Sequence, residues 1–120
     1  MGGGVNLKNN GYWSAAGWAF RTVFHSIQSE LDIDAPYGLY EEICDENSST
    51  VLLEYVSADE WPKEKLQYFC GVVQRAFQKF VSDGLDPSTG RPYPPSLVEL
   101  YRDLLNRLEK ELQSSVDVAE

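Results

Sequence analysis

The side chains that most often carry out catalysis are scarce in this sequence. It has one histidine, His25, and two cysteines, Cys44 and Cys70. A reactive thiolate needs a base beside it, and a structural zinc site needs about four closely spaced ligands, so these residues show neither pattern. The sequence also lacks a phosphate-binding loop and a nucleophile elbow. We therefore expect a protein that is not an enzyme and uses no cofactor, with a small enzyme of unrecognised site as an alternative.

The oxygen-rich middle of the chain is the remaining candidate for a metal. Asp45, Asn47 and Ser49 match the first, third and fifth positions of a calcium-binding loop. Thr50 stands where that loop requires glycine, and Val56 stands where it requires a bidentate glutamate. We interpret the segment as a turn rich in polar side chains and expect no metal site.

Net charge is the most informative property of the composition. The chain has 19 acidic and 10 basic residues, a formal net charge of -9. No lysine or arginine occurs within residues 22–62, whereas ten acids do, and the rest of the chain is nearly neutral. Those acids are Glu30, Asp32, Asp34, Glu41, Glu42, Asp45, Glu46, Glu54, Asp59 and Glu60. Such a surface disfavours nucleic acids and anionic membranes, because both are bound by cationic side chains.

One explanation of this acidic segment is a basic protein partner. A surface of one charge sign speeds encounter with an oppositely charged protein, and buried aromatic side chains then hold the complex. Bacterial immunity proteins and antitoxins that cap a basic nuclease or toxin are inhibitors of this class, and we expect such a protein-binding role. The expected acidic contacts are Glu41, Glu42, Asp45, Glu46 and Glu54, and the expected aromatic anchors are Tyr40, Tyr55 and Trp61. The alternative is that the acids only raise solubility.

A second candidate surface lies on the first predicted helix. Trp18 and His25 are seven residues apart, so they share a face nearly opposite the apolar side chains of that helix. An outward tryptophan breaks the polar pattern and is typical of a binding surface. Two interpretations remain open, because another element could instead cover Trp18. This face, or the leucine-rich last helix, would also suit a structural or adaptor subunit that forms a homodimer.

Three amphipathic helices would position these residues. Apolar spacings of three, four and seven predict helices over 13–31, 57–81 and 96–113. Ser57 and Ser96 each precede a glutamate by three residues, the pattern of a capping box. The proline-rich loop 86–95 separates the last two helices.

The segment between the first two helices allows two structures. Residues 39–44 and 50–56 could form a β-hairpin, which we favour, because the second stretch is rich in strand formers. The alternative is a short helix with Leu39, Tyr40, Ile43 and Cys44 on one side.

The predicted fold class is mainly α: three helices packed as a small bundle, with a short hairpin or a fourth helix between the first two. We expect a single domain over 1–120, with a flexible lead-in at 1–11 and a frayed tail at 114–120. No apolar run is long enough to cross a membrane, the N-terminal residues lack the apolar core of a signal peptide, and two cysteines are too few for a disulfide scaffold. We therefore expect a cytoplasmic protein with buried free thiols, although a single bridge is the alternative.

Overall fold

The computed structural model describes residues 3–9, 11–44, 55–85 and 90–118. Within these ranges the protein is mainly helical, with four α-helices and one three-stranded sheet. The mainly helical class is thus confirmed. The arrangement differs from a bundle of three helices, because strand residues Val5, Trp13 and Val56 share the core with the helices.

Strand β1 (Gly3–Leu7) lies at the centre of the sheet. It pairs antiparallel with β2 (Gly11–Ala15) and parallel with β3 (Tyr55–Ser57). The flexible lead-in expected over 1–11 is therefore wrong for these strand residues. A Cβ atom on Gly4 would come within 2.5 Å of the Tyr12 ring. Gly4, one of the glycines that suggested flexibility, instead allows close approach within the sheet.

Helix α1 (Gly17–Gln28) is shorter than the helix predicted over 13–31. Trp13 was expected on its buried face but belongs to β2, where it is 1% exposed. Its indole Nε1 donates a hydrogen bond to the backbone oxygen of Leu100 at 3.0 Å. Of the other predicted core positions, Phe20, Val23, Phe24, Ile27 and Leu31 are buried, whereas Ala16 is exposed just before α1 begins.

Residues 39–44 form a helix and not a strand, so the favoured hairpin is wrong here and the short helix is confirmed. Helix α2 (Leu39–Cys44) buries Leu39 and Ile43 completely. The side chain of Gln28 donates a hydrogen bond to the Ile43 carbonyl at 2.8 Å and ties α2 to α1. The expected turn at 45–49 and residues 50–54 lie outside the described part of the chain. Strand β3 pairs with β1 and not with residues 39–44.

The two long helices are those that the sequence predicts most closely. Helix α4 (Lys63–Asp83) ends at Gly84, whose φ of 68° is the left-handed cap expected for it. The capping box at Ser57 is wrong: Ser57 makes no capping hydrogen bond and precedes the short 3-10 turn Ala58–Glu60. Helix α5 (Pro95–Val118) begins one residue before the predicted Ser96 and continues into the segment expected to fray.

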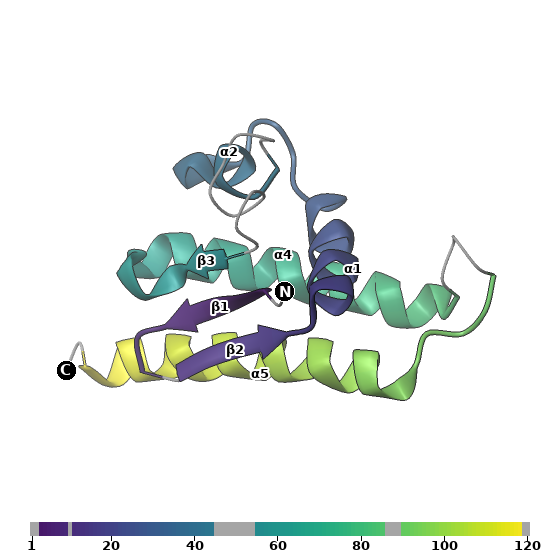
Figure 1. The fold of residues 1–120 in the computed structure, drawn as a ribbon. Helices are drawn as coiled ribbons and strands as arrows, with labels where there is room; N and C mark the ends of the chain where they lie inside the picture. The colour runs from purple at the N-terminus through teal and green to yellow at the C-terminus, as the bar shows by residue number, and fades with distance from the viewer. Residues whose placement is uncertain (1–2, 10, 45–54, 86–89, 119–120) are drawn as a thin grey trace.

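The core lies between the long helices, the sheet and α1. Figure 1 shows α4 and α5 side by side, β2 along α5, and α1 crossing the long helices, with α2 standing away from them. The buried stripe of α5 consists of Leu97, Tyr101, Leu104 and Leu108. This layout leaves two surfaces exposed: the outer face of α1 and the connection between α1 and α2.

Candidate functional site

Only some of the acids predicted to contact a partner are described. Glu41 on α2 is exposed. Glu42 accepts a hydrogen bond from the Lys65 Nζ atom at 2.7 Å and forms an ion pair within the protein. Asp45, Glu46 and Glu54 lie outside the described residues.

The predicted aromatic anchors are more buried than a free contact surface requires. Tyr40 is partly buried against the core. The Trp61 ring packs edge-on against Phe69, with centroids 5.2 Å apart, and the Lys65 Nζ atom lies 4.5 Å from the ring centroid. Trp61 therefore stabilises the start of α4. The backbone of Tyr55 forms part of β3, and its side chain is not described.

The exposed apolar side chains of the acidic segment are instead Ile33 and Tyr37. Their exposed fractions are 71% and 50%. Both lie in the connection between α1 and α2, which Figure 1 shows at the end of the molecule away from α5. Asp32 and Asp34 flank Ile33 in the chain, so apolar and acidic groups alternate on this connection.

Tyr37 is held in an uncommon backbone conformation. Its φ of 65° is left-handed, which costs a non-glycine residue about 1 to 2 kcal/mol. The ring contacts Tyr68 of α4 edge-on, with centroids 6.5 Å apart. A hollow of about 280 Å³ lies beside this contact, lined by Pro36, Tyr37, Glu64, Gln67 and Tyr68. A half-exposed tyrosine next to a hollow is a typical anchor site for a partner side chain.

Asp32, Asp34, Glu41 and Glu64 are exposed, and none forms a hydrogen bond or ion pair through its side chain with another described residue. Together with Ile33, Tyr37 and Tyr68 we call these residues the acidic corner. Glu30, by contrast, accepts a hydrogen bond from Lys79 at 3.1 Å.

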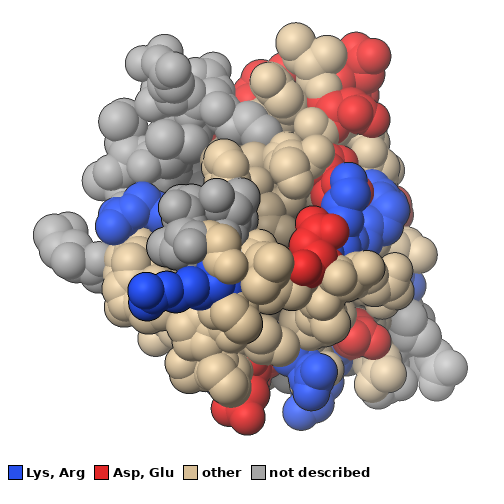
Figure 2. Space-filling view, turned by 90° about the vertical axis from the view of Figure 1, so that its right-hand side faces the viewer, with Lys and Arg blue, Asp and Glu red and all other residues tan. Residues whose placement is uncertain are grey.

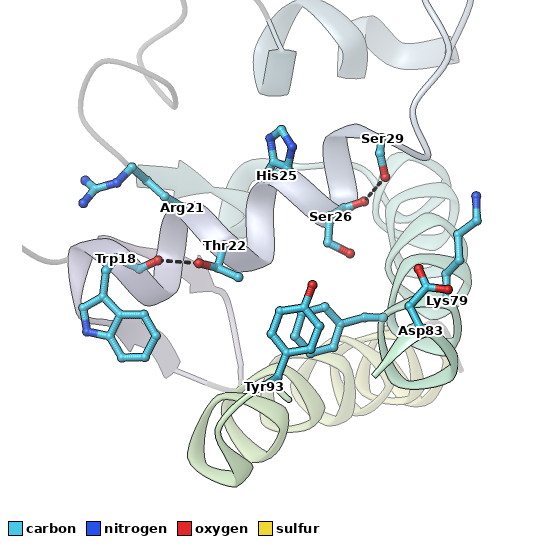
Figure 3. Close-up of a pocket in the computed structure, with 10 residues that line it drawn as sticks. Trp18, Arg21, Thr22, His25, Ser26, Ser29, Lys79, Asp83 and Tyr93 are labelled. Carbon is cyan, nitrogen blue, oxygen red and sulfur yellow. Dashed lines mark hydrogen bonds between the residues drawn. The ribbon is translucent and has the colours of Figure 1, made fainter. Parts of the chain in front are cut away.

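The Trp18 and His25 face is exposed, so the interpretation in which another element covers Trp18 is wrong. Trp18 is 54% exposed. A cleft of about 600 Å³ adjoins this face, between α1, the end of α4 and the loop before α5 (Figure 3). We call it the α1–α4 cleft. Its lining residues are Trp18, Arg21, Thr22, His25, Ser26, Ser29, Lys79, Phe80, Asp83 and Tyr93.

Comparison with known protein families, curated proteins and solved structures finds no match to this chain. The site must therefore be judged from its own chemistry.

Acidic and basic side chains are unevenly distributed over the surface of the molecule. On the face in Figure 2, acidic side chains gather at the upper edge, whereas basic and acidic groups alternate below.

In the described ranges no cluster of three or more histidine, cysteine, aspartate or glutamate side chains is placed to hold a metal ion. None of the described helices is long and apolar enough to cross a membrane.

Cys70 is a free thiol buried in the core. Burial, with a smaller contribution from the nearby Glu109 carboxylate, raises the pKa of this thiol to about 11. A thiol with a raised pKa is mostly protonated at neutral pH and is a weak nucleophile. The side chain of Cys44 is not described.

The leucine-rich last helix, considered above as a surface for self-association, is used within the chain itself. Leu97, Leu104 and Leu108 are each 2% exposed or less. Their stripe packs on α4 and β2, so it is unavailable to a second copy. Of the two surfaces proposed for a homodimer, only the Trp18 and His25 face is exposed.

Sequence reasoning did not single out Ile33 and Tyr37 as exposed side chains. A signal was present at Tyr37, because it lies between Pro36 and Gly38, two residues typical of a tight turn. A large aromatic side chain in a turn is costly to expose, and this could have marked it as an anchor.

Proposed function

We propose that the protein is a binding module that captures a basic protein partner through the acidic corner. The observation that carries the proposal is the combination of exposed Ile33 and Tyr37 with acids that have no counter-charge among the described residues. Exposed apolar anchors with a charged rim are the usual composition of an interface.

The chemistry of the corner selects the partner. The hollow beside Tyr37 offers two tyrosine rings and the Glu64 carboxylate, which together suit a lysine or arginine side chain. Asp32, Asp34 and Glu41 would steer a positively charged surface toward this hollow. An inhibitor that caps a basic toxin or nuclease, as immunity proteins and antitoxins do, has this division between steering charges and anchors.

Photo-crosslinking tests the proposal directly. A crosslinking phenylalanine analogue would replace Tyr37 in one variant and Tyr12 in a matched control, because both tyrosines are about half exposed. The expected result in cells of the native host is one covalent adduct with a basic protein from position 37 and none from position 12. The same adduct from both positions, or an adduct with an acidic protein, would contradict the proposal.

Charge reversal gives a second, quantitative test on the captured partner. Asp32, Asp34 and Glu41 are changed together to lysine, and the control changes the exposed residues Glu99, Asp103 and Glu109 of α5 in the same way. Both variants alter net charge equally and at different places, and the control also breaks the exposed Asp103–Arg107 pair, which contributes little to stability. The association rate constant should fall steeply for the corner variant and with rising salt, and little for the control. An equal fall of the association rate constant in both variants would show that net charge, and not the acidic corner, controls association.

A further inference from the structure

The α1–α4 cleft is a second site, separate from the acidic corner. Its volume of about 600 Å³ is in the range of small-molecule sites. One wall is a row of hydroxyl groups on α1: Thr22, Ser26 and Ser29. The opposite wall is aromatic, because the Tyr93 ring stacks on Phe80 with centroids 3.9 Å apart. Figure 3 shows Ser26 and Tyr93 extending toward each other across the cleft.

The hydroxyl protons on this wall are already used within the protein. Thr22 Oγ1 donates to the Trp18 carbonyl at 2.8 Å, and Ser29 Oγ donates to the Ser26 carbonyl at 2.6 Å (Figure 3).

Ser26 Oγ lies 3.5 Å from the Ala76 carbonyl and 3.1 Å from the Tyr101 hydroxyl. Both hydroxyls are satisfied when Tyr101 donates to Ser26 and Ser26 donates to Ala76. The row on α1 therefore offers lone pairs to the cleft, and a matching ligand must bring hydrogen-bond donors.

The described lining of the cleft holds one carboxylate, Asp83, together with the cations Lys79 and Arg21. Asp83 lies in the last turn of α4, where the helix dipole is negative and disfavours an acid. No described residue forms a hydrogen bond or ion pair with its side chain. Lys79, four residues earlier, bonds Glu30 instead. Helix α1 also ends beside the cleft at Ser29, so two helix C-termini add their negative potential there.

Aromatic faces complete the cation-binding character. The Trp18 ring lies at one end of the cleft and is half exposed, and the Tyr93 ring forms the opposite wall. Such π-faces attract ammonium and amidinium groups. Arg21 and His25 line the rim of the cleft and extend from the side of α1 away from Tyr93 (Figure 3).

We propose that the α1–α4 cleft binds a small organic cation, an amine or amidine on an apolar body. Its donors would pair with the hydroxyl row and with Asp83, while its apolar body would lie between Trp18 and Tyr93. This site does not depend on the acidic corner, so either proposal can fail alone.

Three probes of nearly equal shape test the charge requirement: cationic benzamidine, neutral benzamide and anionic benzoate. Binding to the full chain would be followed by calorimetry and by NMR shifts of the Trp18 indole and the Thr22 amide. Benzamidine should saturate these shifts at millimolar concentration, benzamide should bind about tenfold more weakly, and benzoate should not bind. Equal binding of the three probes, tighter binding of benzoate, or no binding would each overturn the proposal.

A pair of matched variants locates the site. Asp83→Asn removes the carboxylate from the cleft, and Glu109→Gln removes one exposed charge from α5. Asp83→Asn should weaken benzamidine binding about tenfold, and Glu109→Gln should leave it unchanged. Because both are surface positions, thermal melts should show that both variants fold. Benzamidine binding that is unchanged in Asp83→Asn would overturn the assignment.

Discussion

The carboxylate of Glu111 binds the backbone N–H of Asn9, 102 residues earlier in the chain, with both oxygens at 3.1 Å. Glu111 is 4% exposed, and it links α5 to the turn between β1 and β2. Removing this carboxylate takes away two part-buried hydrogen bonds to a charged acceptor. Glu111→Ala should therefore lower the free energy of unfolding by about 2 to 3 kcal/mol, measured by urea denaturation.

The control for Glu111 is Asp103→Asn, which breaks the exposed pair between Asp103 and Arg107 one helical turn apart. That change should cost about 0.5 kcal/mol or less. If both variants lose the same free energy of unfolding, the link between α5 and the turn stabilises the protein no more than an exposed ion pair does.

Trp13→Phe tests the hydrogen bond between β2 and α5. The variant keeps a large aromatic ring in the core but loses the donor to the Leu100 carbonyl. We expect a loss of about 1 to 2 kcal/mol, smaller than the roughly 3 to 5 kcal/mol expected for Trp13→Ala. Urea midpoints with unchanged slopes would give both values. An unchanged midpoint for Trp13→Phe would show that this bond does not stabilise the fold.

The raised pKa of Cys70 predicts how stability depends on alkaline pH. The folded state holds the thiol proton up to a pKa of about 11, against an ordinary value of 9.0. This contribution is fully present below pH 9.0 and is lost as the pH rises through about 11. In a Cys44→Ser background, the native thiol should react slowly with a disulfide reagent, and Cys70→Ala should flatten the alkaline loss of stability. Fast reaction of the folded protein would show that the thiol is accessible.

Tyr37→Asn separates binding from folding. Asparagine tolerates the left-handed backbone at this position, so the lost contact with Tyr68 is offset by relief of strain. Stability should change by about 1 kcal/mol or less, while affinity for the partner captured at the acidic corner should fall roughly 30-fold. Calorimetry and thermal melts on the same sample would show both effects. A variant that binds normally would remove Tyr37 from the interface.

Apolar periodicity in the sequence is sufficient to predict the long helices but not the strands β1 and β2. The stripes of α4 and α5 repeat over many turns, so one misplaced residue does not change the prediction. Trp13 precedes Phe20 by seven residues, a spacing that fits a helix face, yet Trp13 lies in β2 and its ring contacts Phe20 and the Leu100 carbonyl of α5. A strand of five residues is too short to show a clear alternating pattern.

The sequence predicts the charge of the candidate site but not which of its apolar side chains are exposed. The acidic segment locates the corner within the chain, because charge is visible in the sequence. Exposure is set by packing: Trp61 is partly covered because Phe69 and Lys65 contact it, while Ile33 is 71% exposed because none of the described elements covers it. Only the three-dimensional arrangement distinguishes these two side chains.

The position of β1 has a consequence for biosynthesis. This strand precedes in the chain both its parallel neighbour β3, which begins at Tyr55, and α5, whose Glu111 binds the turn after β1. One edge of the central strand therefore stays unpaired until β3 has been translated. Pairing at this distance in sequence slows folding and exposes strand edges meanwhile. The nascent chain thus exposes this strand edge until β3 is available to pair with it.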